Sequence, residues 1–117
     1  MKNDDLKIWD IWEANVPYID DNTKSSKRPV LILASNVILV LKMTTHQHSN
    51  NPKPFEYEVM KWQDAGLTAK TFIQCDRFIT LPLSSFTGKK YGRLTMTDII
   101  GVRTMMSFHG LSIEERN

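Results

Sequence analysis

Residues 27–46 decide the fold, and their sequence is KRPVLILASNVILVLKMTTH. Two apolar, β-branched runs at 30–34 and 37–41 are bounded by polar residues, a pattern that predicts two buried neighbouring strands. Only the Ser-Asn pair at 35–36 separates the runs. A linker this short predicts a tight hairpin with antiparallel strands.

The hairpin predicts where its two polar ends lie. In an antiparallel pair the start of the first strand lies beside the end of the second. Arg28 should therefore lie near Thr44 and Thr45. Arg presents a planar fork of donors and Thr adds a neutral donor, so this arrangement is suited to holding a phosphate group.

Length and composition indicate a single domain, 1–117, that buries about two-thirds of its unfolded surface without a metal or disulfide. The one cysteine, Cys75, has no partner in the chain, and the first residues lack the charged and apolar regions of a signal peptide. The longest apolar run is too short to span a bilayer. We therefore expect a cytoplasmic protein with no membrane contact.

The distribution of charge is more informative than its sum. Fifteen Lys and Arg against thirteen Asp and Glu give a formal charge of only +2, which alone does not indicate nucleic-acid binding. However, residues 24–53 hold five Lys or Arg and no acid, whereas six acids crowd the first 21 positions. This asymmetry predicts a basic face around the hairpin ends.

The rest of the chain predicts short strands and one helix. Residues 8–16 favour a strand over a short helix, 55–59 and 71–81 favour strands, 18–27 and 46–54 favour loops, and 61–67 favours a turn ending at Gly66. Thr95 and Asp98 form a capping-box pattern before apolar residues at helical spacing, and Gly110 marks the C-terminal stop. Five strands and one C-terminal helix predict a mainly β (α+β) fold, a small barrel with a helix packed on it.

Six segments stand in an order and spacing that resembles the MazF/PemK (Kid) toxins of prokaryotic type II toxin-antitoxin systems. They are Asp10-Ile11-Trp12, Arg28-Pro29, Met43-Thr44-Thr45, Pro54-Phe55-Glu56, Asp76 and Gly92-Arg93-Leu94. The resemblance implies an SH3-like barrel (MazF/CcdB/Kid-like), a homodimer, and metal-independent, sequence-selective cleavage of single-stranded RNA. It also implies a cognate acidic antitoxin, and inhibition of translation and growth through cleavage of mRNA.

On this resemblance Arg28 and Thr44 match the catalytic residues. Attack of a ribose 2′-hydroxyl on the adjacent phosphate would leave a 2′,3′-cyclic phosphate and a 5′-hydroxyl, and Arg28 beside Thr44 would stabilise the charge that develops. Proton donation by Arg28 to the leaving oxygen stays open, and no base is evident because Arg stays protonated. The predicted substrate-binding residues are Lys27, Thr45, His46, Asp76 and Arg77.

Three positions depart from the family pattern. Trp9 stands where a Gly commonly precedes the first Asp, and Asp20-Asp21-Asn22 replaces the frequent Gly-Ser-Glu of the flexible loop. Arg77 stands where a Gln often follows the late-strand Asp. The first two changes affect loop geometry, and the third predicts an altered preference for RNA sequence.

Other interpretations of the same residues remain open. Arg28 could form a surface ion pair with Asp20 or Asp21, an interaction that is common and weak. His46 and His48 share one face of an extended strand, but two histidines without a third ligand do not make a metal site, so we predict no cofactor. His46 could instead assist proton transfer or stack on a base.

Two further functions fit the same fold. A CcdB-like gyrase poison would need its determinants on the C-terminal helix and tail, and the tail 112–117 contains no Trp. An RNA-binding module without cleavage would lack the chemistry that Arg28 and Thr44 suggest. We therefore expect the nuclease.

Overall fold

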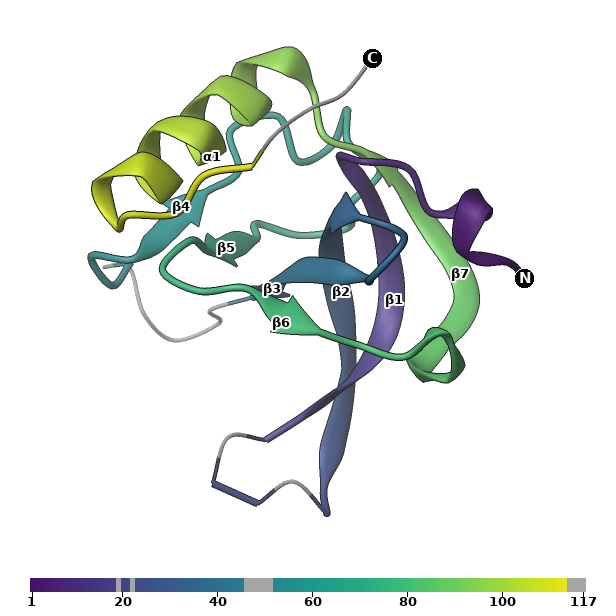
Figure 1. The fold of residues 1–117 in the computed structure, drawn as a ribbon. Coiled ribbons are helices and arrows are strands. Elements are labelled where there is room, and N and C mark those ends of the chain that lie inside the picture. The colour runs from purple at the N-terminus through teal and green to yellow at the C-terminus, as the bar shows by residue number, and fades with distance from the viewer. Residues whose placement is uncertain (19, 22, 46–51, 114–117) are drawn as a thin grey trace.

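The computed structural model describes residues 1–18, 20–21, 23–45 and 52–113. In these segments the chain forms strands β1 (Asp10–Pro17), β2 (Ser25–Ala34), β3 (Leu39–Thr44), β4 (Glu56–Glu58), β5 (Phe72–Gln74), β6 (Ile79–Thr80) and β7 (Phe86–Arg93), helix α1 (Met96–Phe108), and the 3-10 turns η1 (Asn3–Asp5) and η2 (Leu83–Ser85). Helix α1 lies across one end of the curved sheet, and the β1–β2 hairpin extends away from the other end (Figure 1). No helix in the described segments is long and apolar enough to cross a membrane.

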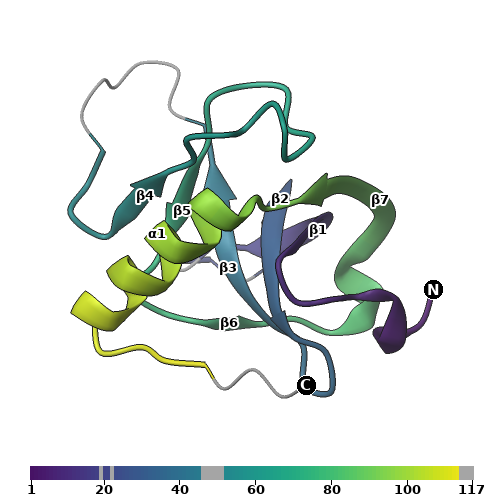
Figure 2. The same ribbon diagram turned by 90° about the horizontal axis from the view of Figure 1, so that it is seen from above.

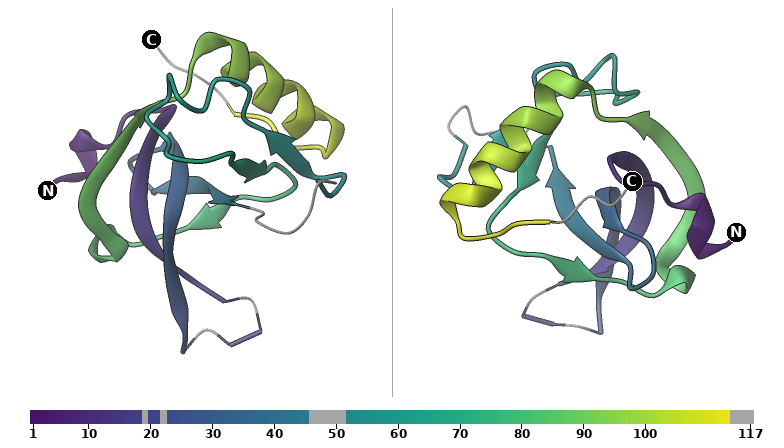
Figure 3. Two further views of the ribbon diagram at one scale, coloured as in Figure 1. Left: turned by 180° about the vertical axis from the view of Figure 1, so that it is seen from behind. Right: turned by 45° about the horizontal axis from the view of Figure 1, so that its top comes forward.

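The strands form one antiparallel sheet in the order β4-β5-β3-β2-β1-β7, with β6 also paired to β3. The sheet curls around α1, as the views from above and behind show (Figures 2 and 3). Among the described residues no pairing joins β4 to β7, so the sheet is curved but not closed. The mainly β fold with a C-terminal helix is confirmed, and the term barrel applies only loosely.

The predicted hairpin forms, but its turn is longer than two residues. Val30 pairs with Lys42 and Ile32 with Val40, and a bulge follows before Ala34. The turn covers residues 35–38, because Ile38 leaves the strand and buries its side chain instead. The prediction of a tight two-residue linker is therefore wrong.

The hairpin strands are apolar at successive positions because they are buried on both faces. Leu31 and Leu41 belong to the hydrophobic cluster that includes the buried face of α1. Val30, Ile32 and Val40 face the opposite way, into a second cluster. A continuous apolar run is the expected pattern for a strand covered on two sides.

Strand β3 has a divided edge on the side away from β2. Its residues Met43 and Thr44 pair with β5, whereas Leu39 and Val40 pair with β6. The strand predicted at 71–81 is therefore two short strands, joined by a connection that passes from one end of β3 to the other. Leu41 and Lys42 lie between the two pairings.

Strand β7 was absent from the predicted elements. It is largely exposed and polar, and its pairing with β1 contains register shifts. Without a buried face it carries no apolar alternation, so the sequence offered no signal for it. The remaining strand predictions, 8–16 and 55–59, correspond to β1 and β4, while β2 begins inside the loop predicted at 18–27.

Helix α1 begins and ends where the sequence predicted, but its first turn uses different chemistry. Thr95 is the N-cap, and the helix ends before Gly110, whose φ is +75°. Asp98 is fully buried and accepts hydrogen bonds from Tyr57 Oη at 2.7 Å and from the backbone N–H groups of Met60 and Lys61 at 2.8 Å each. The carboxylate thus fixes the helix to the 57–61 segment and does not cap its own backbone.

Trp9 occupies a backbone conformation that suits glycine. Its φ is +72°, the one positive value at a non-glycine residue in the described segments. The Trp9 N–H donates to the Ile32 carbonyl at 2.8 Å, its carbonyl accepts from the Leu94 N–H at 2.9 Å, and its side chain is buried. These two backbone hydrogen bonds and the buried indole hold Trp9 in a conformation that glycine adopts more readily.

Candidate functional site

Arg28 and Thr44 line one pocket of about 290 Å³. Its lining residues are Arg28, Lys42, Thr44, Lys53, Phe55, Glu56 and Gln74. The prediction that Arg28 lies near Thr44 is confirmed. The pocket lies at the end of β3, where β2 is on one side and β4 and β5 are on the other.

The register of the sheet explains why these side chains meet. Val30 and Lys42 are direct partners, so two residues further along Arg28 comes opposite Thr44. Alternation then places Arg28, Lys42 and Thr44 on the same face. Glu56 and Gln74 are partners in the β4–β5 pair and complete the far wall.

The Arg28 guanidinium is oriented by a side chain of its own strand, β2. Its Nε and Nη2 atoms donate to Ser26 Oγ at 3.1 and 2.6 Å. Among the described residues Arg28 forms no ion pair, so the interpretation as a surface pair with Asp20 or Asp21 gains no support. The fork is held on one side, and no carboxylate of the described segments neutralises it.

Positive charge dominates the pocket. The pKa of Lys42 lies below its ordinary value because the side chain is partly buried and because Arg28, Arg77 and Lys53 repel its charge. Glu56 is the weakest of these influences and acts in the opposite direction. Its Oε1 atom accepts the Lys53 backbone N–H at 2.8 Å. A pocket of this kind is suited to an anion.

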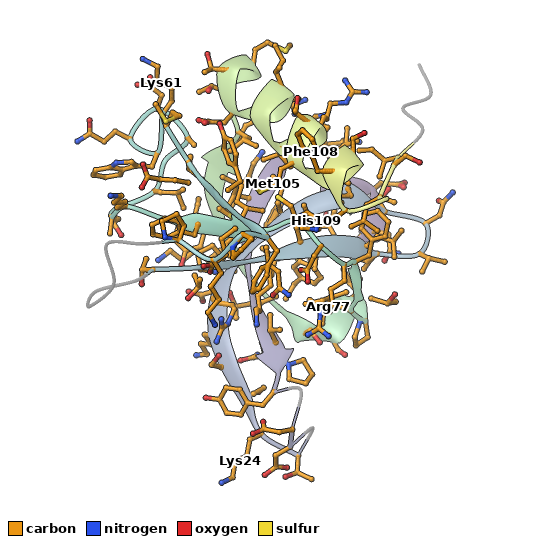
Figure 4. All side chains as sticks on the ribbon, turned by 90° about the vertical axis from the view of Figure 1, so that its left-hand side faces the viewer. Lys24, Lys61, Arg77, Met105, Phe108 and His109 are labelled. Atoms are coloured by element: carbon orange, nitrogen blue, oxygen red, sulfur yellow. The ribbon has the colours of Figure 1, made fainter. Side chains whose placement is uncertain are left out.

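The other predicted substrate-binding residues are dispersed around the pocket. Arg77 is exposed near β6 and close enough to act on Lys42 (Figure 4). Asp76 is half-buried, and its Oδ1 atom is buried without a hydrogen-bond partner in the described part of the chain. Lys27 alternates onto the opposite face from Arg28, where it acts on Glu13.

Thr45 is exposed just after β3 and is not part of the pocket lining. His46 and His48 lie outside the described residues, so the predicted roles of His46 stay predictions. Within the described segments no group of three or more potential metal ligands occurs. Burial, with the nearby charge of Asp76, raises the pKa of the Cys75 thiol to about 12, so this cysteine stays protonated at neutral pH.

Sequence reasoning gave no role to Lys42, Lys53, Phe55, Glu56 or Gln74. Lys42 had a usable signal, since it stands two residues before Thr44 and alternation puts both on one face. Gln74 had none, because its place depends on the pairing of β5 with β3 and β4.

Comparison with known proteins identifies related families and folds. A family model described as "PemK-like, MazF-like toxin of type II toxin-antitoxin system" matches residues 7–107. Comparison with curated proteins finds no match.

Two solved structures share the fold. One is described as an "endoribonuclease in complex with its cognate antitoxin from Mycobacterial species", with a TM-score of 0.64, 16% identity, and coverage of 92% of this chain and 97% of that chain. The other is the Mycobacterium tuberculosis toxin MazF-mt6, with a TM-score of 0.58, 21% identity, and coverage of 85% and 95%. At these identities the similarity shows the fold alone.

Proposed function

Because the chain belongs to the PemK-like, MazF-like toxins of type II toxin-antitoxin systems, we propose that it is a metal-independent, sequence-selective endoribonuclease acting on single-stranded RNA in the cytoplasm. The observation that carries this proposal is the pocket that holds Arg28 and Thr44 together among further cations.

The proposed reaction is an intramolecular transesterification. The ribose 2′-oxygen gives its proton to solvent water and forms a bond to the adjacent phosphorus, and the bond from phosphorus to the 5′-oxygen breaks. The 5′-oxygen takes up a proton, so the products are a 2′,3′-cyclic phosphate and a 5′-hydroxyl. No water is consumed in this step.

In this reaction Arg28 stabilises the negative charge that develops on the phosphoryl oxygens. Ser26 holds one side of the guanidinium, so the fork is oriented before RNA binds. Preorganised donors of this kind are the largest single source of transition-state stabilisation in many enzymes. Thr44, which lines the same pocket, donates its hydroxyl to the phosphate and orients it. A second proposed role of Arg28 is to give a proton to the leaving oxygen and regain it from solvent.

The remaining predicted residues bind the RNA on either side of the reacting phosphate. The Asp76 carboxylate would accept a hydrogen bond from a base amino group, and Arg77 would attract a neighbouring phosphate. Lys27 and Thr45 would contact the strand where it leaves the pocket, and His46 would act on the proton or stack on a base.

We further propose a homodimer and an acidic antitoxin. Met96, Ile100 and Phe108 are exposed on one face of α1 at intervals of four or eight residues, which is an apolar surface suited to association. The antitoxin would present an acidic, extended segment to Arg28 and the 18–27 loop, and would compete there with RNA.

The proposal is tested by incubating the purified protein with a long mixed-sequence RNA in excess chelator and analysing the new ends. Cleavage with 5′-hydroxyl ends is the expected result. Complete dependence on an added divalent metal would contradict the mechanism, and RNA binding without cleavage would favour the non-catalytic alternative. A gyrase poison would leave RNA intact and inhibit DNA supercoiling.

A further inference from the structure

Lys42 lines the pocket together with Arg28 and Thr44, and the β2–β3 pairing sets its place there. It is a direct partner of Val30, and it precedes Thr44 by two residues on the same face. Strand β3 is held by β2 on one side and by β5 and β6 on the other. The Lys42 backbone is therefore fixed, and only its flexible side chain can adjust.

Lys42 lies where buried apolar residues of the sheet meet the polar lining of the pocket. Its strand neighbour Val40 and its partner Val30 are both fully buried. Lys42 itself is partly buried, and in the described part of the chain it forms no ion pair. Burying a charge without a partner costs stability, so the fold itself gives no reason for a lysine here.

The charges that face Lys42 come from every element packed around the pocket. Arg28 on β2, Lys53 before β4 and Arg77 after β5 all repel it, and Glu56 on β4 attracts it weakly. Lys53 and Arg77 are exposed and solvated, so Lys42 is the cation on which the repulsion is concentrated. An anion in the pocket would attract Lys42 and offset the repulsion from the neighbouring cations.

We propose that Lys42 is a substrate-binding residue that holds a phosphate of the RNA beside Arg28 and Thr44. The inference rests on the proposed function, because RNA is the ligand that brings phosphate into this pocket. Lys42 supplies a point charge on a flexible stem, whereas Arg28 supplies an oriented fork, so the two residues divide charge compensation and orientation between them.

Phosphate binding by Lys42 has a measurable consequence for protons. The pKa of Lys42 in the free protein is lowered by burial and by the cations around it, and a bound phosphate raises this pKa again. RNA binding should therefore take up a proton at pH values between the pKa of Lys42 in the free protein and its pKa in the complex. Affinity is at its full value below the free pKa and falls as pH rises through that range.

The experiment uses the shortest RNA that the wild-type protein cuts, prepared with 2′-O-methyl riboses so that no attack occurs. Its Kd is measured against salt and pH for the wild type, Lys42→Met, Lys42→Arg and the control Lys61→Met. Lys61 is exposed and far from Arg77 (Figure 4). Melting curves of each variant establish that it is folded.

Lys42→Met should weaken binding about tenfold and lower the slope of log K against log salt by about 0.7, the value for one phosphate contact to a single strand. Lys42→Arg should keep the salt slope and bind within about threefold of the wild type. It should also lose the fall in affinity at high pH, because Arg stays protonated. Lys61→Met should match the wild type in all three measurements.

Equal Kd and salt slope for Lys42→Met and the wild type would overturn the inference. Intact binding of the 2′-O-methyl RNA with slow cleavage of the unmodified RNA in Lys42→Met would also overturn it, since that result assigns Lys42 to proton transfer. A wild-type protein that neither cuts nor binds RNA would instead overturn the proposed function, and the inference with it. The two failures are therefore distinguishable.

Discussion

The guanidinium of Arg28 is held by one hydroxyl, that of Ser26, which accepts from both Nε and Nη2 at 3.1 and 2.6 Å. The two residues are two positions apart on β2 and so share a face. Within the described segments the contact leaves Nη1 available to a phosphate, and it reduces the freedom that Arg28 would lose on binding RNA.

Ser26→Ala should therefore lower the rate of RNA cleavage about fivefold to tenfold, the effect of one net hydrogen bond. The loss should appear in kcat more than in KM, because Ser26 orients Arg28 and does not touch the RNA. Ser26→Thr should restore the rate, since it returns the hydroxyl. If Ser26→Ala and the exposed control Ser84→Ala both cleave RNA at the wild-type rate, the contact does not orient the arginine.

Arg28→Ala should lower the rate by two to three decades, the expected loss for one preorganised donor to the developing charge. Thr44→Ala should cost less, because Arg28 and the other cations still hold the phosphate. Single-turnover cleavage of a defined RNA measures both effects. A Thr44→Ala loss larger than that of Arg28→Ala would exchange the roles given to the two residues.

Lys42→Met should stabilise the folded protein at neutral pH. The pKa of Lys42 is lowered by burial and neighbouring cations, so folding disfavours its charged form. The penalty is present below the folded pKa and is relieved as pH rises through it toward the ordinary value. We expect a gain of up to about 1 kcal/mol after solvent screening.

Urea denaturation at a series of pH values checks this prediction. The advantage of Lys42→Met over the wild type should shrink as the solution becomes alkaline, leaving only a constant term from apolar packing. Lys61→Met should show no such pH dependence. Greater stability together with weaker RNA binding would mark Lys42 as a residue that improves function at a cost in stability.

At position 9 the glycine variant should be more stable than the alanine variant, which is the reverse of the usual order. Both Trp9→Ala and Trp9→Gly should destabilise the protein by several kcal/mol, because a buried indole is lost. However, the Gly variant should be the more stable by about 1 kcal/mol, since φ is +72° there. Lys7 is exposed and has an ordinary φ, so there the alanine variant should be at least as stable as the glycine variant. If alanine and glycine rank in the same order of stability at positions 7 and 9, the argument is refuted.

Asp98→Ala should destabilise the protein by about 3 kcal/mol, because three donors on the 57–61 segment lose a buried carboxylate. Hydrogen exchange should accelerate first at the amides of Met60 and Lys61. Asp64→Ala, at an exposed position, provides the comparison. If exchange accelerates equally throughout the sheet, Asp98 stabilises the fold generally and does not fix this segment.

The parts of the fold that could be predicted are those with a buried face. The β2–β3 hairpin carries continuous apolar runs and α1 carries apolar residues at helical spacing, and the meeting of Arg28 with Thr44 follows from antiparallel pairing. Strand β7 could not be predicted because it is exposed, and the turn at 35–38 could not because Ile38 is drawn into the second cluster.

The candidate site shows the same division. Arg28, Lys42 and Thr44 lie on adjacent strands, so local alternation suffices to bring them together. Glu56 and Gln74 reach the pocket only through pairings between strands far apart in the sequence. The capping-box pattern at Thr95 and Asp98 was misleading, because a buried tertiary contact took the carboxylate away from its local role.

At the divided edge of β3, the hydrogen-bonded ladders that hold the sheet are separate from the connection between β5 and β6. The connection from β5 to β6 bypasses Leu41 and Lys42 and carries Asp76 and Arg77, while the ladders on either side of it carry the sheet. Changes of charge in this connection therefore leave both ladders in place. On the proposed function, this connection would be the first segment to exchange when a different RNA specificity is sought, because its side chains can change while the sheet is kept.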